Sequence, residues 1–270
     1  SNVGETKNQG IEISLSSLNI NTKSFQWTTD VMFYANKESI ESLYNGKVDD
    51  IGNKWFIGHP INVHYDYEKI GIWQNTPEDL AEMEEFNKNG ANFKPGDIKI
   101  WDNGDKKITE ADRKILGSTS PKFIASMVNS ISYKGFDFSI FLYASVGAML
   151  NNNIEYLNKP GRANSIVIDY WTPTNPTNAY PRPSVDNASP AYVKSLQYEK
   201  ADFIRVRNIT LGYTLPEKLL KKIRARKIRV YLSANNPFII TGFSGIDPEG
   251  ARGYTAPSAS TWMGGVNLSF

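Results

Sequence analysis

The stretch Gly135–Gly147 reads GFDFSIFLYASVG, and its side chains largely alternate between apolar and more polar ones. Alternate positions of a β-strand point to opposite faces, so this pattern predicts a strand with one apolar face and one more polar face. Its length, about ten residues, exceeds the ~5–6 residues that are usual in globular sheets. The apolar face holds Phe136, Phe138, Ile140, Leu142, Ala144 and Val146, and the opposite face holds Asp137, Ser139, Tyr143 and Ser145.

The same alternation recurs along the chain and predicts about seven long strands in an all-β fold. The segment 201–216 carries one irregularity: Ile204 and Val206 are in one phase, whereas Ile209 and Leu211 are in the other. A slip of one residue near Arg207 is typical of a β-bulge. The other predicted strands are IEISLS (11–16), FQWTTDVMFYA (25–35), FIASMVNSISY (123–133), KIRVYLSAN (227–235) and WMGGVNLSF (262–270).

Short and long connections alternate between these strands. NTKS (21–24) and YKGF (133–136) predict tight turns, and PEKLLKKIRARK (216–227) predicts one or two helical turns after Pro216. The remaining connections are long, at about 37–121, 151–201 and 237–260. Antiparallel strands connected in this way have all short turns at one end, which is typical of outer-membrane barrels.

Seven strands with an apolar face would leave two sheet edges and that face open. Bacterial barrels of one chain also have an even number of strands. The sequence therefore predicts that residues 1–270 are one piece of a larger transmembrane β-barrel with long extracellular loops.

Composition excludes several classes of protein. Thirty basic and 28 acidic residues give a net charge of +2, and no basic block is interleaved with aromatic residues as nucleic-acid binding requires. No apolar run is long enough for a membrane helix of ~18 residues, and the absence of cysteine excludes disulfides and thiolate sites. The mean hydropathy of −0.42 is ordinary for a soluble protein. It does not exclude a barrel, because barrel strands alternate.

The acidic residues of TPEDLAEMEEFNKNG (76–90) are the main candidates for catalytic carboxylates. Their spacing instead fits the solvated face of a short helix that begins with Thr76 as its cap and Pro77 in its first turn. Glycoside hydrolysis needs two carboxylates facing each other across a sugar, which this spacing does not favour. We expect no catalytic residues, and the chain is predicted not to be an enzyme.

The segment WDNGDKKITEAD (101–112) resembles a calcium loop. Hard oxygen ligands at alternate positions around a glycine suit Ca²⁺. The segment departs from the pattern because it is one residue short before Asn103, Lys106 occupies the position usually held by glycine, and the last ligand is a short Asp. The alternative is a loop closed by Asx turns. The candidate ligands are Asp102, Asn103, Asp105, the backbone oxygen of Lys107, and Asp112.

Several segments together resemble the C-terminal part of the SusC/RagA-like TonB-dependent outer-membrane transporters. They cover nearly the whole chain in the order found in that family. The segments are NVGETKNQGIEISL (2–15), GDIKIWDNGDKKITEADRKILGSTSPKF (96–123), YWTPTNPTNAYPRP (170–183), ADFIRVRNITLGYTLPEKLLKKI (201–223), IRVYLSANNPFIITGFSGIDPE (228–249) and VNLSF (266–270).

The resemblance implies a transporter of the bacterial outer membrane with a plugged lumen, energised through TonB. The N-terminal plug, the TonB-contacting region and the remaining strands would lie outside this chain. A SusD-like surface lipoprotein would cap the extracellular side, and Phe270 would act as the barrel-insertion signal. The expected cargo is an oligosaccharide. The alternatives are peptide import by the same architecture, or a soluble β-rich glycan-binding or adhesin module.

Aromatic side chains in the long connections are the candidate ligand contacts, since aromatic faces stack on sugar rings and pack against peptides. The alternative is that they pack the loops onto one another or onto the capping lipoprotein. The candidates are Trp55, Trp73, Trp171, Tyr180 and Tyr254.

Overall fold

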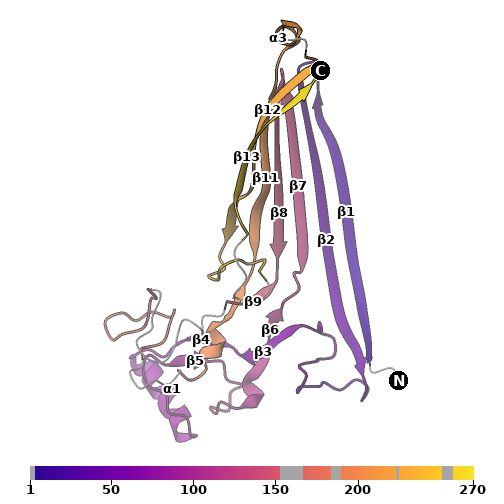
Figure 1. Cartoon of the computed structure of the whole chain (residues 1–270). Coiled ribbons are helices and arrows are strands. Elements are labelled where there is room, and N and C mark those ends of the chain that lie inside the picture. Colours follow the sequence, from indigo (N-terminus) through magenta and orange to yellow (C-terminus); the bar gives the residue numbers. More distant parts are fainter. Residues whose placement is uncertain (1–3, 153–166, 184–189, 223–224, 251–257) are drawn as a thin grey trace.

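The computed structural model describes residues 4–152, 167–183, 190–222, 225–250 and 258–270. Seven antiparallel strands form one sheet in the order β1-β2-β7-β8-β11-β12-β13, which confirms the predicted number (Figure 1). The strands are β1 Gly4–Asn21, β2 Phe25–Leu43, β7 Phe123–Tyr133, β8 Phe136–Val146, β11 Phe203–Thr214, β12 Lys227–Thr241 and β13 Thr261–Ser269.

Strand register gives the sheet one apolar face. Phe138 of β8 pairs with Leu211 of β11, which pairs with Leu232 of β12, and directly paired residues share a face. The predicted slip in β11 is confirmed as a bulge between Val206 and Asn208 in both of its pairings. The bulge keeps apolar residues on this face along the whole strand.

The opposite face of the sheet is polar. Ser132 of β7 pairs with Asp137, and Thr210 of β11 pairs with both Ser139 and Ser233. Thr210 and Ser233 also share a hydrogen bond with 2.8 Å between their hydroxyl oxygens. The sheet therefore separates an apolar side from a polar side, as the alternation predicts.

Three strands are longer than the alternating pattern indicates, and β1 spans Gly4–Asn21 rather than 11–16. β2 continues to Leu43 and β12 continues to Thr241, so the first and third long connections begin after these residues rather than at about 37 and 237. The segment Lys37–Leu43 is largely polar, and its extended form is fixed by pairing with Gly4–Gln9 of β1. This pairing has no signal in the local sequence.

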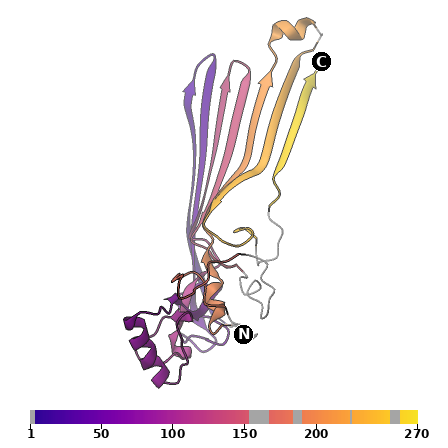
Figure 2. The ribbon, with the colours of Figure 1, turned by 90° about the vertical axis from the view of Figure 1, so that its left-hand side faces the viewer.

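The described parts of the first and second long connections contain short helices and strands, and they form a lobe at the end of the sheet opposite the short turns (Figures 1 and 2). Thr76 caps α1 by accepting a hydrogen bond from the backbone of Asp79, as predicted. The elements outside the large sheet are β3 Val63–Tyr67, β4 Lys69–Ile72, α1 Pro77–Lys88, β5 Ile98–Ile100, the 3-10 helix η1 Glu110–Asp112, β6 Arg113–Ser118, β9 Met149–Asn151, the 3-10 helix η2 Val193–Leu196, β10 Tyr198–Lys200 and the short-turn helix α3 Glu217–Lys222.

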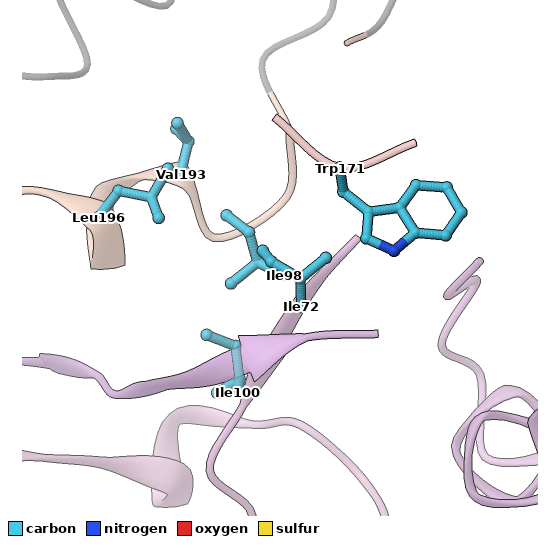
Figure 3. Close-up of a cluster of buried hydrophobic side chains, with 6 residues drawn as sticks. All are labelled: Ile72, Ile98, Ile100, Trp171, Val193 and Leu196. Atoms are coloured by element: carbon cyan, nitrogen blue, oxygen red, sulfur yellow. The ribbon is translucent and has the colours of Figure 1, made fainter. Parts of the chain in front are cut away.

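The lobe has its own hydrophobic core, built from both of the first two long connections. Figure 3 shows Trp171 and Val193 of the second connection beside Ile72, Ile98 and Ile100 of the first. A neighbouring cluster contains Trp73, Met83, Phe86 and Phe93. Burial of these side chains is what holds the lobe together.

In the part of the chain that the structure describes, no helix has the length and apolar character needed to cross a membrane.

Candidate ligand site at the mouth of the sheet

The polar face of the sheet meets the lobe at a cavity of about 780 Å³. Tyr143 of β8 and Phe203 of β11 reach it from the sheet, and His64 of β3 reaches it from the lobe. Nε2 of His64 lies 3.0 Å from the backbone oxygen of Met149, and burial lowers the pKa of this histidine. Phe203 is buried, so Tyr143 is the half-buried aromatic side chain that the sheet places beside the polar groups of the cavity, a combination suited to sugars or peptides.

A buried ion-pair cluster borders this cavity through Glu249. Arg205 of β11 is 3% exposed, and its guanidinium lies 2.7 Å from Asp247 and 2.6 Å from Glu249. Arg207 also pairs with Glu249. These contacts attach the segment Gly242–Gly250 to β11, on the side of the sheet where the cavity opens.

Asp247 is held in its charged form. Burial acts to raise its pKa, but hydrogen bonds from the backbone of Ser258 and Glu249, together with the charge of Arg205, outweigh burial and lower the pKa. The carboxylate therefore stays ionised beside Arg205, and the cluster remains a charged anchor at ordinary pH.

A second cavity, of about 370 Å³, lies within the lobe and is lined by Tyr180, Lys69 and Glu199. The ammonium of Lys69 donates hydrogen bonds to the backbone oxygens of Asn178 (2.7 Å) and Ala179 (2.8 Å). Burial lowers the pKa of Lys69 and raises the pKa of Tyr180. Tyr180, one of the predicted aromatic ligand contacts, thus lines a cavity of the lobe.

Trp73 and Trp171 pack in the interior of the lobe. Trp73 is 1% exposed and Trp171 is 6% exposed, and each belongs to a core cluster of the lobe. The indole nitrogen of Trp171 donates to Gln74 at 2.8 Å. For these two residues the arrangement favours the packing alternative over ligand contact, because neither ring face is open to a ligand. Trp55 is half-buried and pairs with Asp50 across a tight turn, and Tyr254 lies outside the described residues.

The predicted calcium loop brings three carboxylates together. Asp102, Asp105 and Asp112 each offer an oxygen, and these oxygens lie within 4.8 Å of one another. Asp112 is completely buried and accepts hydrogen bonds from the backbone of Asn103 (3.0 Å) and Thr109 (2.6 Å).

The loop also has the hydrogen bonds expected of a loop closed by Asx turns, which is the alternative to a calcium site. Asn103 and Asp105 each accept a backbone hydrogen bond from two residues further on, at 3.1 Å and 2.9 Å, as in Asx turns. Lys106 adopts a left-handed backbone, with φ at 58°, and its ammonium lies 2.9 Å from Glu82 rather than against the loop carboxylates.

One atom favours the cation interpretation of this loop. Oδ1 of Asp102 is buried and has no hydrogen-bond partner among the described residues. A buried carboxylate oxygen without a donor costs free energy, which a bound cation would remove. The oxygen-rich donor set therefore fits Ca²⁺.

The sequence did not single out the residues at the mouth of the sheet as a site. Tyr143 was visible only as a polar-face residue of its strand, and the pairing of Arg205 with Asp247 joins residues 42 positions apart. The alternating pattern does place Tyr143 on the polar face of its strand, and this is the face that turns toward the lobe. No local pattern indicates the Arg205 pair.

Comparison with known proteins identifies relatives of this chain. No family model matches it. It is 32% identical over 265 residues to the TonB-dependent receptor P3 of Formosa agariphila, covering 92% of this chain and 26% of that protein. It is 30% identical to the TonB-dependent receptor SusC of Bacteroides thetaiotaomicron, over 100% of this chain and 27% of that protein.

Solved structures of related transporters also resemble this chain. The RagAB peptide transporter matches with a TM-score of 0.76 and 24% identity, over 100% of this chain and 30% of the matched chain. The RagAB peptide importer in its open-open state matches with a TM-score of 0.74 and 25% identity, over 99% and 29%. The chain thus spans less than a third of the length of these relatives, which are receptors and transporters rather than enzymes. It belongs to the SusC/RagA-like TonB-dependent receptors and corresponds to a C-terminal portion of them.

Proposed function

We propose that this chain forms part of the barrel wall and the loops of a TonB-dependent importer in the bacterial outer membrane, with an oligosaccharide as cargo. The observation that carries the proposal is the seven-stranded antiparallel sheet, apolar on one face and polar on the other, with its long connections folded into a lobe at one end. Lipid would cover the apolar face, and the polar face would line the lumen.

The exposed apolar face supports the membrane over a soluble module. Large apolar side chains are about half exposed along it, far more than the surface of a soluble monomer tolerates. The open edges of β1 and β13 would pair with the remaining strands of the barrel, since unpaired edges are not stable in lipid. The exposed apolar residues include Ile11, Ile13, Leu15, Leu211, Val230, Leu232 and Val266.

An oligosaccharide is favoured by the mixture of tyrosine faces and polar groups in the cavities at Tyr143 and Tyr180. A peptide is the second candidate, because the similar solved structures are those of a peptide importer. In both cases we propose that a SusD-like lipoprotein covers the lobe side. TonB would act through a region outside this chain, and Phe270, which is exposed at the short-turn end, would act as the insertion signal.

The cargo is tested by purifying the full-length transporter with its lipoprotein from its host and releasing bound molecules by denaturation. Mass ladders spaced by sugar residues would support an oligosaccharide, and ladders spaced by amino-acid residues would support a peptide. Labelled cargo should then enter cells that carry the transporter and not cells that lack it or lack TonB. Equal uptake in all three strains would contradict the proposed function.

We further propose that the loop of Asp102, Asp105 and Asp112 holds Ca²⁺ as a structural ion. Asn103 and the backbone oxygen of Lys107 remain the other proposed ligands. Trp101 adjoins Asp102, so Tb³⁺ in the site should luminesce when the indole is excited. Ca²⁺ should compete with Tb³⁺ in the ~10⁻⁴–10⁻³ M range of extracellular calcium modules.

The Asp102→Asn variant of the full-length transporter should lose at least tenfold in Tb³⁺ affinity, because it removes charge at the oxygen that lacks a donor. Glu84→Gln is the control, since Glu84 is an exposed residue of α1 that pairs with Lys88. Luminescence that is unchanged in Asp102→Asn would leave the loop as a hydrogen-bonded turn.

A further inference from the structure

Three connections meet at the short-turn end of the sheet: residues 21–24, 133–136 and 215–227. Backbone hydrogen bonds join them, from Lys134 to Ser24 (3.3 Å) and from Thr214, at the end of β11, to Gly135 (2.8 Å). Figures 1 and 2 both show them at the end opposite the lobe. The described residues of these connections, which exclude 223 and 224, form one surface, which we call the cationic rim.

Charge is segregated onto this rim. Its three connections contain eight lysines and arginines and one glutamate, whereas the rest of the chain contains 22 basic and 27 acidic residues. The net charge of the whole chain is only +2, but this end of the sheet is strongly positive. The described basic side chains of the rim are all exposed, and within the described ranges none of them forms an ion pair. They are Lys23, Lys134, Lys218, Lys221, Arg226 and Lys227.

Aromatic rings line the edge of the rim that adjoins the apolar face. Phe25 and Tyr133 are in edge contact, with ring centroids 6.3 Å apart, and Phe136 and Tyr213 are 4.5 Å apart. The ammonium of Lys134 lies 5.1 Å from the centre of the Tyr133 ring. An apolar surface, then aromatic rings, then long cationic side chains is the order found where protein passes from hydrocarbon to lipid headgroups.

The helix α3 also places an exposed apolar side chain beside cationic ones. Leu220 is buried, whereas Leu219 is half exposed among Lys218 and Lys221. A short helix with an exposed leucine and lysines beside it suits the boundary between acyl chains and headgroups better than open water.

We propose that the cationic rim binds the phosphate headgroups of anionic phospholipids in the leaflet that faces the short turns. The proposal rests on the proposed membrane location, which makes that leaflet the periplasmic one. The continuity of the rim with the aromatic and apolar surfaces favours a lipid over a soluble anion, since only a lipid contacts all three layers. Each cation beside an anionic leaflet strengthens binding by roughly fivefold.

The test uses the full-length transporter in detergent, titrated with phosphatidylglycerol or phosphatidylcholine and followed by native mass spectrometry. Phosphatidylglycerol should bind at least tenfold more tightly than phosphatidylcholine, and added salt should weaken it. The rim variant replaces Lys23, Lys134, Lys218 and Lys221 with glutamine and should lose most of this preference. The control replaces four exposed lysines of the lobe, Lys47, Lys54, Lys94 and Lys194, and should keep it.

Equal binding of the two lipids to the unmodified transporter, or equal loss in the rim variant and the control, would overturn the proposal. Heat-dependent migration of each variant in gels reports whether the barrel has folded, so a folding defect is recognised separately. A transporter that cannot be recovered from the outer membrane at all would contradict the proposed function instead. Unchanged binding in a folded rim variant would leave these lysines as solvated turn residues.

Discussion

Replacing Asp247 with alanine is expected to destabilise the full-length transporter by about 3–5 kcal/mol, because it leaves the buried guanidinium of Arg205 without one of its two partners. The side chains of Arg205 and Asp247 are 4% and 5% exposed, so water cannot replace the lost carboxylate. The segment Gly242–Gly250 should detach from β11 and become sensitive to protease. Thermal unfolding in detergent, together with limited proteolysis, measures both effects.

Two further variants separate burial from charge. Glu110→Ala removes an ion pair with Arg113 in which the glutamate is 83% exposed, and it should cost less than about 1 kcal/mol. Replacing Arg205 by methionine in the Asp247→Leu background should recover part of the stability, because neither of these two positions then holds a buried charge and Glu249 keeps Arg207 as its partner. An Asp247→Ala variant that melts like the unmodified protein would show that the cluster does not anchor this segment.

Replacing Trp171 with alanine should loosen the lobe by about 3–5 kcal/mol, since it removes a large side chain from the core that Ile72 and Ile98 share with it. It also removes the hydrogen bond to Gln74. Because Trp171 lies on one long connection and Gln74 on another, the loss should free both. Proteolysis of the lobe in the full-length transporter measures the effect, with the sheet as an internal reference.

The same variant distinguishes packing from ligand contact. Trp171→Phe keeps most of the buried volume and should preserve both the lobe and uptake. The exposed Tyr44→Ala is the control for loss of an aromatic ring at the loop surface. If Trp171→Ala abolished cargo uptake while the lobe remained protected, the tryptophan would be a ligand contact after all, and the packing interpretation would be wrong.

Local patterns in the sequence were sufficient for the sheet. Period-two alternation indicated the seven strands, and the phase change near Arg207 indicated the bulge. The turn residues placed all short connections at one end. These features follow from neighbours in the sequence, because side-chain direction along a strand and turn geometry are local properties. Thr76 and Pro77 indicated the start of α1 for the same reason.

Strand ends and side-chain roles depended on partners far away in the sequence. Lys37–Leu43 is extended because β1 pairs with it, not because of its own residues. From the sequence alone Trp73 and Trp171 could either contact a ligand or pack the loops together, and the core that the first two long connections share favours packing.

What the sequence by itself determined is therefore the two-faced sheet, its sidedness and its family. Only the tertiary structure decided which loop residues are buried and which carboxylate pairs with Arg205, and it joined three turns that the sequence placed at one end into a single cationic rim. The physical reason is that strands, caps and turns are set by residues a few positions apart. Burial and ion pairing are set by distances in space, which a periodic pattern does not contain.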